Sequence, residues 1–209
     1  MKKIILSALA VFAFGFANAQ EAKFGVKGAL NISSLSGDVE DASSLIGFQI
    51  GGFAEFKISD TFSFQPELMY SAQGGKESYT ESFSGVKHTE EITTKLGYLN
   101  IPLMAKFYVA KSFSLEVGPQ IGFLLSAKDN YEITESFNGS SFSASESEDI
   151  KDITNSVNFG LNFGAGYDFT ENLSAGLRYN VGLTNIYDTD DDDYNVKNSV
   201  FSISLGYKF

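Results

Sequence analysis

Few side chains in this sequence suit catalysis or soft-metal binding. The 209 residues include one histidine, three methionines and no cysteine, which excludes disulfides, thiolate nucleophiles and cysteine-ligated zinc. The histidine, His88, lies near Ser78, Ser82 and Ser84, and a serine activated by a nearby histidine is able to transfer or hydrolyse acyl groups. Because no residue is placed by the sequence to orient His88, we expect no catalytic site.

A run of aspartates near the end of the chain offers hard oxygen ligands. Asp188, Asp190 and Asp192 have the alternate spacing of a calcium-binding loop. The sixth position of that loop is Asp193, where an EF-hand needs glycine, and the twelfth is Ser199, where it needs glutamate. The three aspartates are therefore weak calcium candidates, and we expect no resident metal or cofactor.

A third set of charged residues lies within segments whose apolar residues alternate with polar ones. The set contains both signs in equal number: Lys27, Glu55, Lys57, Glu67, Lys106, Glu116, Asp168 and Arg178. Each falls on the polar side of its segment. Unpaired buried charge is costly, so we expect these side chains to form an ionic network inside the protein.

The segments that carry these charges have the two-residue period of β-strands. There are eight of them: 23–32, 46–58, 62–73, 99–109, 113–125, 157–169, 173–183 and 201–209. Pro66, Pro102 and Pro119 lie inside strands. Because proline removes a ladder hydrogen bond, we expect local bulges there.

Short and long connections alternate between the segments. Three are tight turns, at 59–61, 110–112 and 170–172, and four are long, at 33–45, 74–96, 126–156 and 184–198. Outer-membrane barrels have this pattern. The sequence therefore predicts an all-β fold: an eight-stranded antiparallel transmembrane β-barrel with short periplasmic turns and long extracellular loops.

Side-chain volume decides which strand face points inward. An eight-stranded barrel is only just wide enough to be filled by side chains, and the face rich in Phe, Tyr, Leu, Ile and Val is too bulky to fit. The face rich in Gly, Ser and Asn is therefore predicted to fill a closed polar lumen. The apolar face would contact outer-membrane lipid.

Residues 1–19 have the pattern of a secretory signal peptide. Lys2 and Lys3 precede an apolar run from Ile4 to Phe16, and Ala17-Asn18-Ala19 is a small-x-small cleavage site. The run is shorter than the ~20 apolar residues of a membrane-spanning helix. We expect signal-dependent export, followed by insertion of residues 20–209 into the outer membrane as one barrel domain.

The long connections carry most of the negative charge of a chain whose formal net charge is −11. Nucleic acid is therefore not expected as a partner, because its binding depends on lysine and arginine. Asn138-Gly139 is a two-residue hairpin signal, and Tyr131, Ile133 and Phe137 keep the outward parity of the preceding strand. We expect a ribbon above the membrane whose exposed edges suit an envelope protein partner.

Several segments resemble the PorT-like outer-membrane β-barrel proteins of bacteroidete bacteria. The resemblance is carried by Phe24–Asn31, Gln65–Ser71, Tyr98–Leu103, Val117–Gln120 and Arg178–Thr184. It implies an eight-stranded outer-membrane barrel and matches the positions of the intrastrand prolines. The terminal Phe209 resembles the aromatic signal that barrel-assembly machinery reads during insertion. The loops show no resemblance, so the secretion role of the founding member is not transferred.

These observations favour a non-enzymatic outer-membrane barrel whose acidic loops form a binding or packing surface. An accessory subunit of a larger envelope or secretion assembly is the alternative hypothesis. A small lipid-modifying barrel enzyme using His88 is the third.

Overall fold

The computed structural model describes residues 22–39, 42–83, 85–138, 140–188 and 195–209. Its strands are β1 (Ala22–Gly37), β2 (Leu45–Lys57), β3 (Phe62–Phe83), β4 (Val86–Ala110), β5 (Phe113–Phe137), β6 (Ser140–Asp149), β7 (Val157–Asp168), β8 (Leu173–Gly182) and β9 (Val196–Lys208). One 3-10 turn, η1 (Lys151–Ile153), precedes β7. None of the helices in these ranges has the length and hydropathy needed to cross a membrane.

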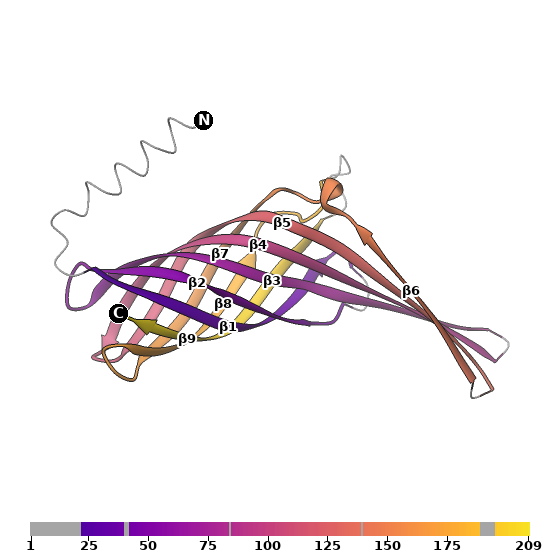
Figure 1. Ribbon diagram of the computed structural model, residues 1–209, viewed down its shortest axis with the longest axis horizontal. Coiled ribbons are helices and arrows are strands. Elements are labelled where there is room, and N and C mark those ends of the chain that lie inside the picture. The colour runs from indigo at the N-terminus through magenta and orange to yellow at the C-terminus, as the bar shows by residue number, and fades with distance from the viewer. Residues whose placement is uncertain (1–21, 40–41, 84, 139, 189–194) are drawn as a thin grey trace.

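Within these residues, eight strands close into an antiparallel ring, whose barrel shape is visible in Figure 1. The order around the ring is β1, β2, β3, β4, β5, β7, β8 and β9, and β9 pairs again with β1. The predicted all-β, eight-stranded antiparallel architecture is confirmed. β6 is an additional strand that pairs with the outer half of β5.

Burial along the ring strands is the reverse of that in a water-soluble protein. Phe24 and Ile46 are 60% and 77% exposed, whereas Asn31 and Asn162 are 0% exposed. The polar face therefore fills the lumen and the apolar face forms the outer wall. This is the distribution that a lipid-facing barrel requires.

Three ring strands, β3, β4 and β5, continue beyond the ring and form a projecting sheet with β6, drawn at the lower right of Figure 1. It consists of 75–83 of β3, 86–95 of β4, 128–137 of β5 and 140–149 of β6. Phe137 pairs with Ser140 and Asn138 has a φ of +47°, as expected for the predicted two-residue hairpin. Two of the four long connections are thus largely β-structure.

A β-bulge lies at the base of the projecting sheet. Tyr98 of β4 pairs with Leu124 of β5, and the preceding Gly97 pairs with Ser126. Leu125 is therefore one extra residue in β5. Such a residue shifts the alternation of every side chain beyond it.

The bulge changes which side of the projecting sheet the residues of β5 occupy. Ala127 and Asp129 are only 1% and 7% exposed, so odd-numbered residues beyond the bulge continue the lumen-facing side. The prediction that Tyr131, Ile133 and Phe137 keep an outward orientation is wrong for this reason.

The three prolines do not coincide with bulges. Pairing of β3 with β4 passes from Pro66–Leu103 to Met69–Asn100 without a change of register. The shifts recorded between β4 and β5 lie at Gly97/Tyr98 and Tyr108/Ala110 instead. The prolines interrupt the ladder because they lack an N–H group, but the register continues past them.

An apolar cluster lies at the outer end of the lumen. Its buried members are Leu35, Leu96, Tyr98, Leu124, Ala127, Ile150, Ile186 and Val196. Leu96 and Tyr98 come from the base of the projecting sheet, and Ile150 and Ile186 come from the connections after β6 and β8. The lumen is therefore polar along the ring strands and apolar at its outer mouth, a layer that the sequence analysis did not anticipate.

Candidate functional site

One charged residue from each ring strand joins a continuous chain of ion pairs in the lumen. In the described part of the molecule, cations and anions alternate along it in the order Lys27, Glu67, Arg178, Glu116, Lys106, Glu55, Lys208 and Asp168. The positive and negative groups are equal in number. This chain therefore adds no net charge to the lumen, and each of its members has an opposite charge beside it.

Glu67 holds one half of the chain. Lys27 Nζ lies 2.6 Å from Glu67 Oε1, and the Arg178 guanidinium donates to both carboxylate oxygens at 2.8 and 2.9 Å. Gln65 Nε2 donates to the same Oε1 at 2.7 Å. Bidentate guanidinium–carboxylate pairs are among the strongest in proteins, and this one joins β3 to β8 across the lumen.

Glu55 holds the other half. Lys106 and Lys208 place their ammonium groups 3.3 and 2.9 Å from Glu55 Oε2, and the Tyr108 hydroxyl donates to Oε1 at 2.6 Å. Lys208 also pairs with Asp168 at 3.2 Å. Strands β2, β4, β7 and β9 are thus tied together inside the ring.

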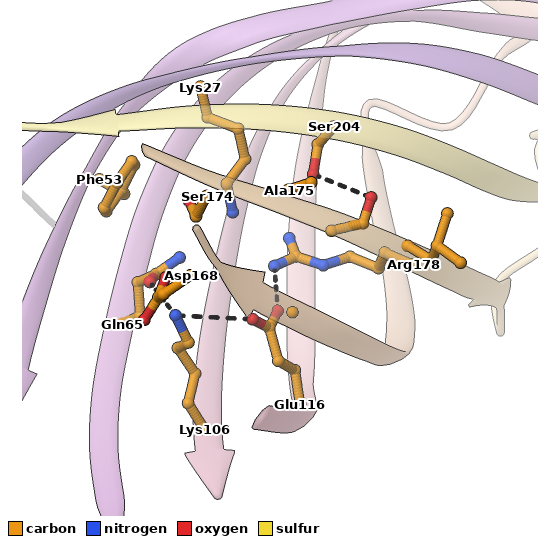
Figure 2. A pocket seen from close by; sticks show the side chains of 13 residues that line it. Lys27, Phe53, Gln65, Lys106, Glu116, Asp168, Ser174, Ala175, Arg178 and Ser204 are labelled. Atoms are coloured by element: carbon orange, nitrogen blue, oxygen red, sulfur yellow. Dashed lines mark hydrogen bonds and ion pairs between the residues drawn. The ribbon is translucent and has the colours of Figure 1, made fainter. Parts of the chain in front are cut away.

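Lys106 connects the two halves. Figure 2 shows Lys106 and Arg178 reaching Glu116 from different strands. The Lys106 ammonium is 3.7 Å from Glu116 Oε1, and Arg178 Nη2 is 3.0 Å from Oε2. The cavity beside these groups has a volume of only about 20 Å³, which is space for about one water molecule.

Seven of the eight residues predicted for the ionic network lie in this chain, and Lys57 does not. Lys57 pairs with Asp60 in the β2–β3 turn at 2.9 Å, and its side chain is 52% exposed. As the last residue of β2, it reaches solvent at the end of the ring. Its place is taken by Lys208, which the sequence analysis missed although the outward-facing Tyr207 and Phe209 on either side required it to point inward.

Amide and hydroxyl side chains continue the hydrogen bonding along the lumen. Asn31 Nδ2 donates to Ser71 Oγ at 3.0 Å, and Ser202 Oγ donates to Asn31 Oδ1 at 3.1 Å. Asn180 Nδ2 donates to Asn162 Oδ1 at 3.1 Å. These bonds join the adjacent strands β1 and β9 and the adjacent strands β7 and β8, and they connect β1 to β3 across β2.

The projecting sheet has two chemically different faces. Cross-strand pairing places odd residues of 75–83 and 129–137 and even residues of 86–94 and 140–148 on one side, here called the acidic face. The complementary residues form the hydroxyl face, where Thr80 contacts Thr89 at 3.2 Å and Thr134 contacts Ser143 at 2.9 Å. The acidic face continues the lumen-facing side of the barrel.

Lysines and carboxylates are segregated between the two faces. Among the described residues, the acidic face carries Glu77, Glu81, Glu90, Asp129, Glu135, Glu146 and Glu148 and neither lysine nor arginine. All four lysines of the sheet lie on the hydroxyl face: Lys76, Lys87, Lys95 and Lys128. That face balances them with Glu91, Glu132 and Asp149, so the negative potential is concentrated on one side.

Burial raises the pKa of two carboxyl groups on the acidic face. Burial is the largest cause for both Asp129 and Glu77, and the charge of Asp129 adds to the increase in the pKa of Glu77. Asp129 Oδ1 has no hydrogen-bond partner among the described residues. Both groups lie beyond the ring, on the side of the projecting sheet that continues the lumen-facing wall.

A family model described as the outer membrane protein beta-barrel domain matches residues 17–188. The chain belongs to this family. Residues of both the ionic chain and the projecting sheet fall within the matched range, whereas all of β9, including Lys208, follows it. No curated protein matches the sequence.

Solved outer-membrane structures similar to this family member share little sequence with it. Ail, the attachment invasion locus protein of Yersinia pestis, in complex with the heparin analogue sucrose octasulfate, is 15% identical with a TM-score of 0.43, covering 91% of this chain and 100% of that chain. Neisserial surface protein A is 16% identical with a TM-score of 0.41 and the same coverage. CarO2 of Acinetobacter baumannii is 14% identical with a TM-score of 0.39, covering 90% and 99%.

The sequence-based catalytic candidates do not come together in this outer-membrane barrel. His88 lies on the acidic face with Nδ1 3.6 Å from Glu135 Oε1. Ser78 and Ser82 lie on the hydroxyl face, on the opposite side of the sheet. Ser84 is outside the described residues. A nucleophile–base pair between His88 and either Ser78 or Ser82 is therefore absent.

The remaining predicted site residues are the three aspartates and Phe209. Asp190 and Asp192 are outside the described residues, and Asp188 alone does not make a calcium site; the described chain holds no cluster of three metal-ligating side chains. Phe209, the proposed assembly signal, is exposed beside Tyr207, with their rings 5.8 Å apart. Its amide donates to the Phe24 carbonyl at 2.8 Å.

Proposed function

We propose that this chain is a non-enzymatic outer-membrane protein with a closed lumen, exported by its signal peptide, whose acidic extracellular surface binds a partner. The alternating chain of ion pairs carries the closed-lumen part of the proposal. It crosses the bore between strands that are not neighbours and leaves a cavity of about 20 Å³. The separation of His88 from Ser78 and Ser82 supports a non-enzymatic role.

Opening the lumen would separate buried charges that pair with one another across the bore. Breaking one buried pair leaves an uncompensated charge and costs about 3–5 kcal/mol. The Glu67 carboxylate, for example, accepts hydrogen bonds from three side chains, those of Lys27, Arg178 and Gln65. The network is therefore suited to joining the walls of the barrel and poorly suited to passing ions.

Electrical recording tests the closed lumen. The full mature protein, reconstituted in a planar bilayer, should give no steady conductance under conditions in which a general porin in the same lipid conducts. The variant Lys57→Met serves as a control because it leaves the ion-pair chain intact. Steady conductance of the wild-type protein would overturn this part of the proposal.

The binding part of the proposal is supported by the segregation of charge on the projecting sheet. A photo-crosslinking amino acid at Glu146 would sample the acidic face in intact cells, and the same group at Ser78 would sample the hydroxyl face on β3, the strand of the projecting sheet farthest from β6. We expect a stoichiometric product from position 146 and none from position 78. Recovery of the barrel alone from both positions would count against a binding role.

The same crosslinking experiment tests the accessory-subunit hypothesis, which the PorT-like resemblance suggests. Recovery of a secretion or envelope assembly at fixed stoichiometry would identify the chain as a subunit of that assembly. Recovery of a single extracellular or envelope protein would identify a free-standing binding protein.

A further inference from the structure

A hollow lies on the acidic face between β5 and β6. It measures about 400 Å³, and its lining includes Tyr131, Ile133 and Ala144 together with the carboxylates of Glu90, Glu146 and Glu148. The hollow is therefore lined by apolar side chains and carboxylates together. A ligand that fills this hollow would combine an apolar body with positive charge.

The charge of the face selects the sign of the ligand. Within the described residues of this face, seven carboxylates are accompanied by no lysine or arginine. An anionic ligand would meet repulsion without a counter-charge. A lysine or arginine side chain could place its methylene stem against the apolar lining residues and its charge near the carboxylates, as such amphipathic side chains do on mixed surfaces.

A buried carboxylate oxygen adds a second observation. Asp129 pairs in register with Glu148 and is 7% exposed, and its Oδ1 has no hydrogen-bond partner among the described residues. Buried carboxylate oxygens are normally paired. Because Asp129 is the cross-strand neighbour of Glu148, a cation bound beside Glu148 would be attracted by both carboxyl groups.

The free edge of β6 favours a polypeptide over a small cation. β6 pairs with β5 on one side and is the terminal strand in the sheet order, with no strand of the described chain on its other side. Its outer N–H and C=O groups are open to another extended chain. Alternate residues of such a chain would lie on the acidic face and the others on the hydroxyl face.

We propose that the projecting sheet binds an extended, cationic polypeptide segment that adds to the edge of β6 and places alternate basic and apolar side chains on the acidic face. This inference rests on the proposed binding function and specifies its partner. In an antiparallel addition, basic residues would face Glu148 and Glu146, and apolar residues would face Ala144 and Phe142. Small hydroxyl residues at the intervening positions would match the serines of the hydroxyl face.

A peptide of sequence Lys-Thr-Lys-Thr-Val-Thr-Val has this pattern in the antiparallel direction. Its fluorescent form would be titrated with the full mature protein in lipid nanodiscs, with fluorescence anisotropy as the readout. The triple variant Glu90→Gln, Glu146→Gln, Glu148→Gln should weaken binding by about tenfold or more, because complementary charges close to one another dominate such contacts. The matched control Glu91→Gln, Glu132→Gln, Asp149→Asn removes the same charge from the hydroxyl face and should change binding by less than about twofold.

A second peptide separates strand addition from simple charge attraction. Replacing the threonines by prolines keeps the charge but removes the backbone donors that pair with β6. We expect this peptide to lose most of its affinity for the wild-type protein. Equal binding of both peptides, or full competition by spermidine, would overturn strand addition in favour of a small-cation site.

The outcomes also distinguish this inference from the broader proposal. Equal weakening by the two triple variants, or the absence of peptide binding, would overturn the cationic-segment inference. A stoichiometric crosslink from position 146 in cells would still support a binding function in that case. Failure of both experiments would remove the projecting sheet as a binding surface.

Discussion

Lys208 is the penultimate residue of the chain, and its ammonium group contacts two carboxylates inside the lumen. It lies 2.9 Å from Glu55 and 3.2 Å from Asp168. These contacts tie the closing strand β9 to β2 and β7, neither of which is its neighbour in the ring. A residue at the chain terminus thus stabilises the closure of the whole barrel.

Replacing Lys208 by Met should destabilise the barrel by about 3–5 kcal/mol, the usual cost of removing one partner from a buried ion pair. Glu55 would keep Lys106, whereas Asp168 would lose the partner at 3.2 Å. Lys57→Met provides the matched control, because the half-exposed Lys57 pairs with an exposed Asp60. Urea unfolding in lipid vesicles, followed by gel mobility of the folded form, measures both. Equal stability of the two variants would contradict the role given to Lys208.

The raised pKa of Asp129 predicts pH dependence in the projecting sheet. Its carboxyl group ordinarily titrates near 3.8, and burial raises that pKa in the folded protein. The folded sheet therefore favours the protonated form, so its stability is greatest below about pH 4 and falls as pH rises through the raised pKa. Asp129→Asn does not ionise and should lack this fall.

Hydrogen-exchange protection factors for 128–137 check this prediction. Protection should be higher in Asp129→Asn than in the wild-type protein at pH 7, and the difference should vanish near pH 3.5. Glu132→Gln, on the hydroxyl face of the same strand, should leave the pH profile unchanged. A constant difference for Asp129→Asn at both pH values would indicate a cause other than ionisation.

Strand parity explains most of what the sequence predicted about individual residues. The alternation of polar and apolar residues placed Glu67 and Arg178 on the polar face of their strands. The volume of the side chains on each face then decided that the polar face points into the lumen. The sequence analysis missed Lys208 although the same parity applied, because the terminal segment was interpreted as an assembly signal. It misplaced Lys57 because parity gives a direction but not the distance from the end of a strand.

At the scale of elements, the bulge at Leu125 decides which residues of the projecting sheet face the lumen side. The Asn-Gly pair at 138–139 predicted the hairpin, because the residue types of a two-residue turn determine its local conformation. The facing of Ile133 was mispredicted because it depends on the register of β5 against β4, and that register is a property of two strands together. No local pattern in either strand records it.

Deleting Leu125 should therefore be tolerated. The deletion would join Leu124 directly to Ser126, and these residues already pair with the adjacent Tyr98 and Gly97. Deleting Ile121 instead would shift one side of β5 by a residue and exchange its lipid-facing and lumen-facing side chains. We expect the first variant to assemble in the outer membrane and the second to fail, as measured by fractionation and gel mobility. Equal failure of both would show that Leu125 is required in its own right.

At the scale of the whole molecule, apolar side chains are exposed in two different surroundings. Ring residues such as Phe163 form the outer wall, whereas Phe142 lies on the projecting sheet beyond the ring. Both rings are widely exposed, at 49% and 72%, so exposure alone does not distinguish them. Their positions relative to the bilayer distinguish the two residues, because only the wall of the ring has the continuous apolar surface that lipid requires.

Phe163→Arg and Phe142→Arg separate these surroundings. An arginine on the lipid face near the bilayer midplane costs about 2–4 kcal/mol, and this cost declines toward the interface. Phe163→Arg should therefore reduce assembly and lower the free energy of unfolding in vesicles by about that amount. Phe142→Arg should insert as well as the wild-type protein, because the projecting sheet lies in water. If Phe142→Arg were instead the more damaging change, the projecting sheet would lie against lipid, and the acidic face would not be open to a soluble partner.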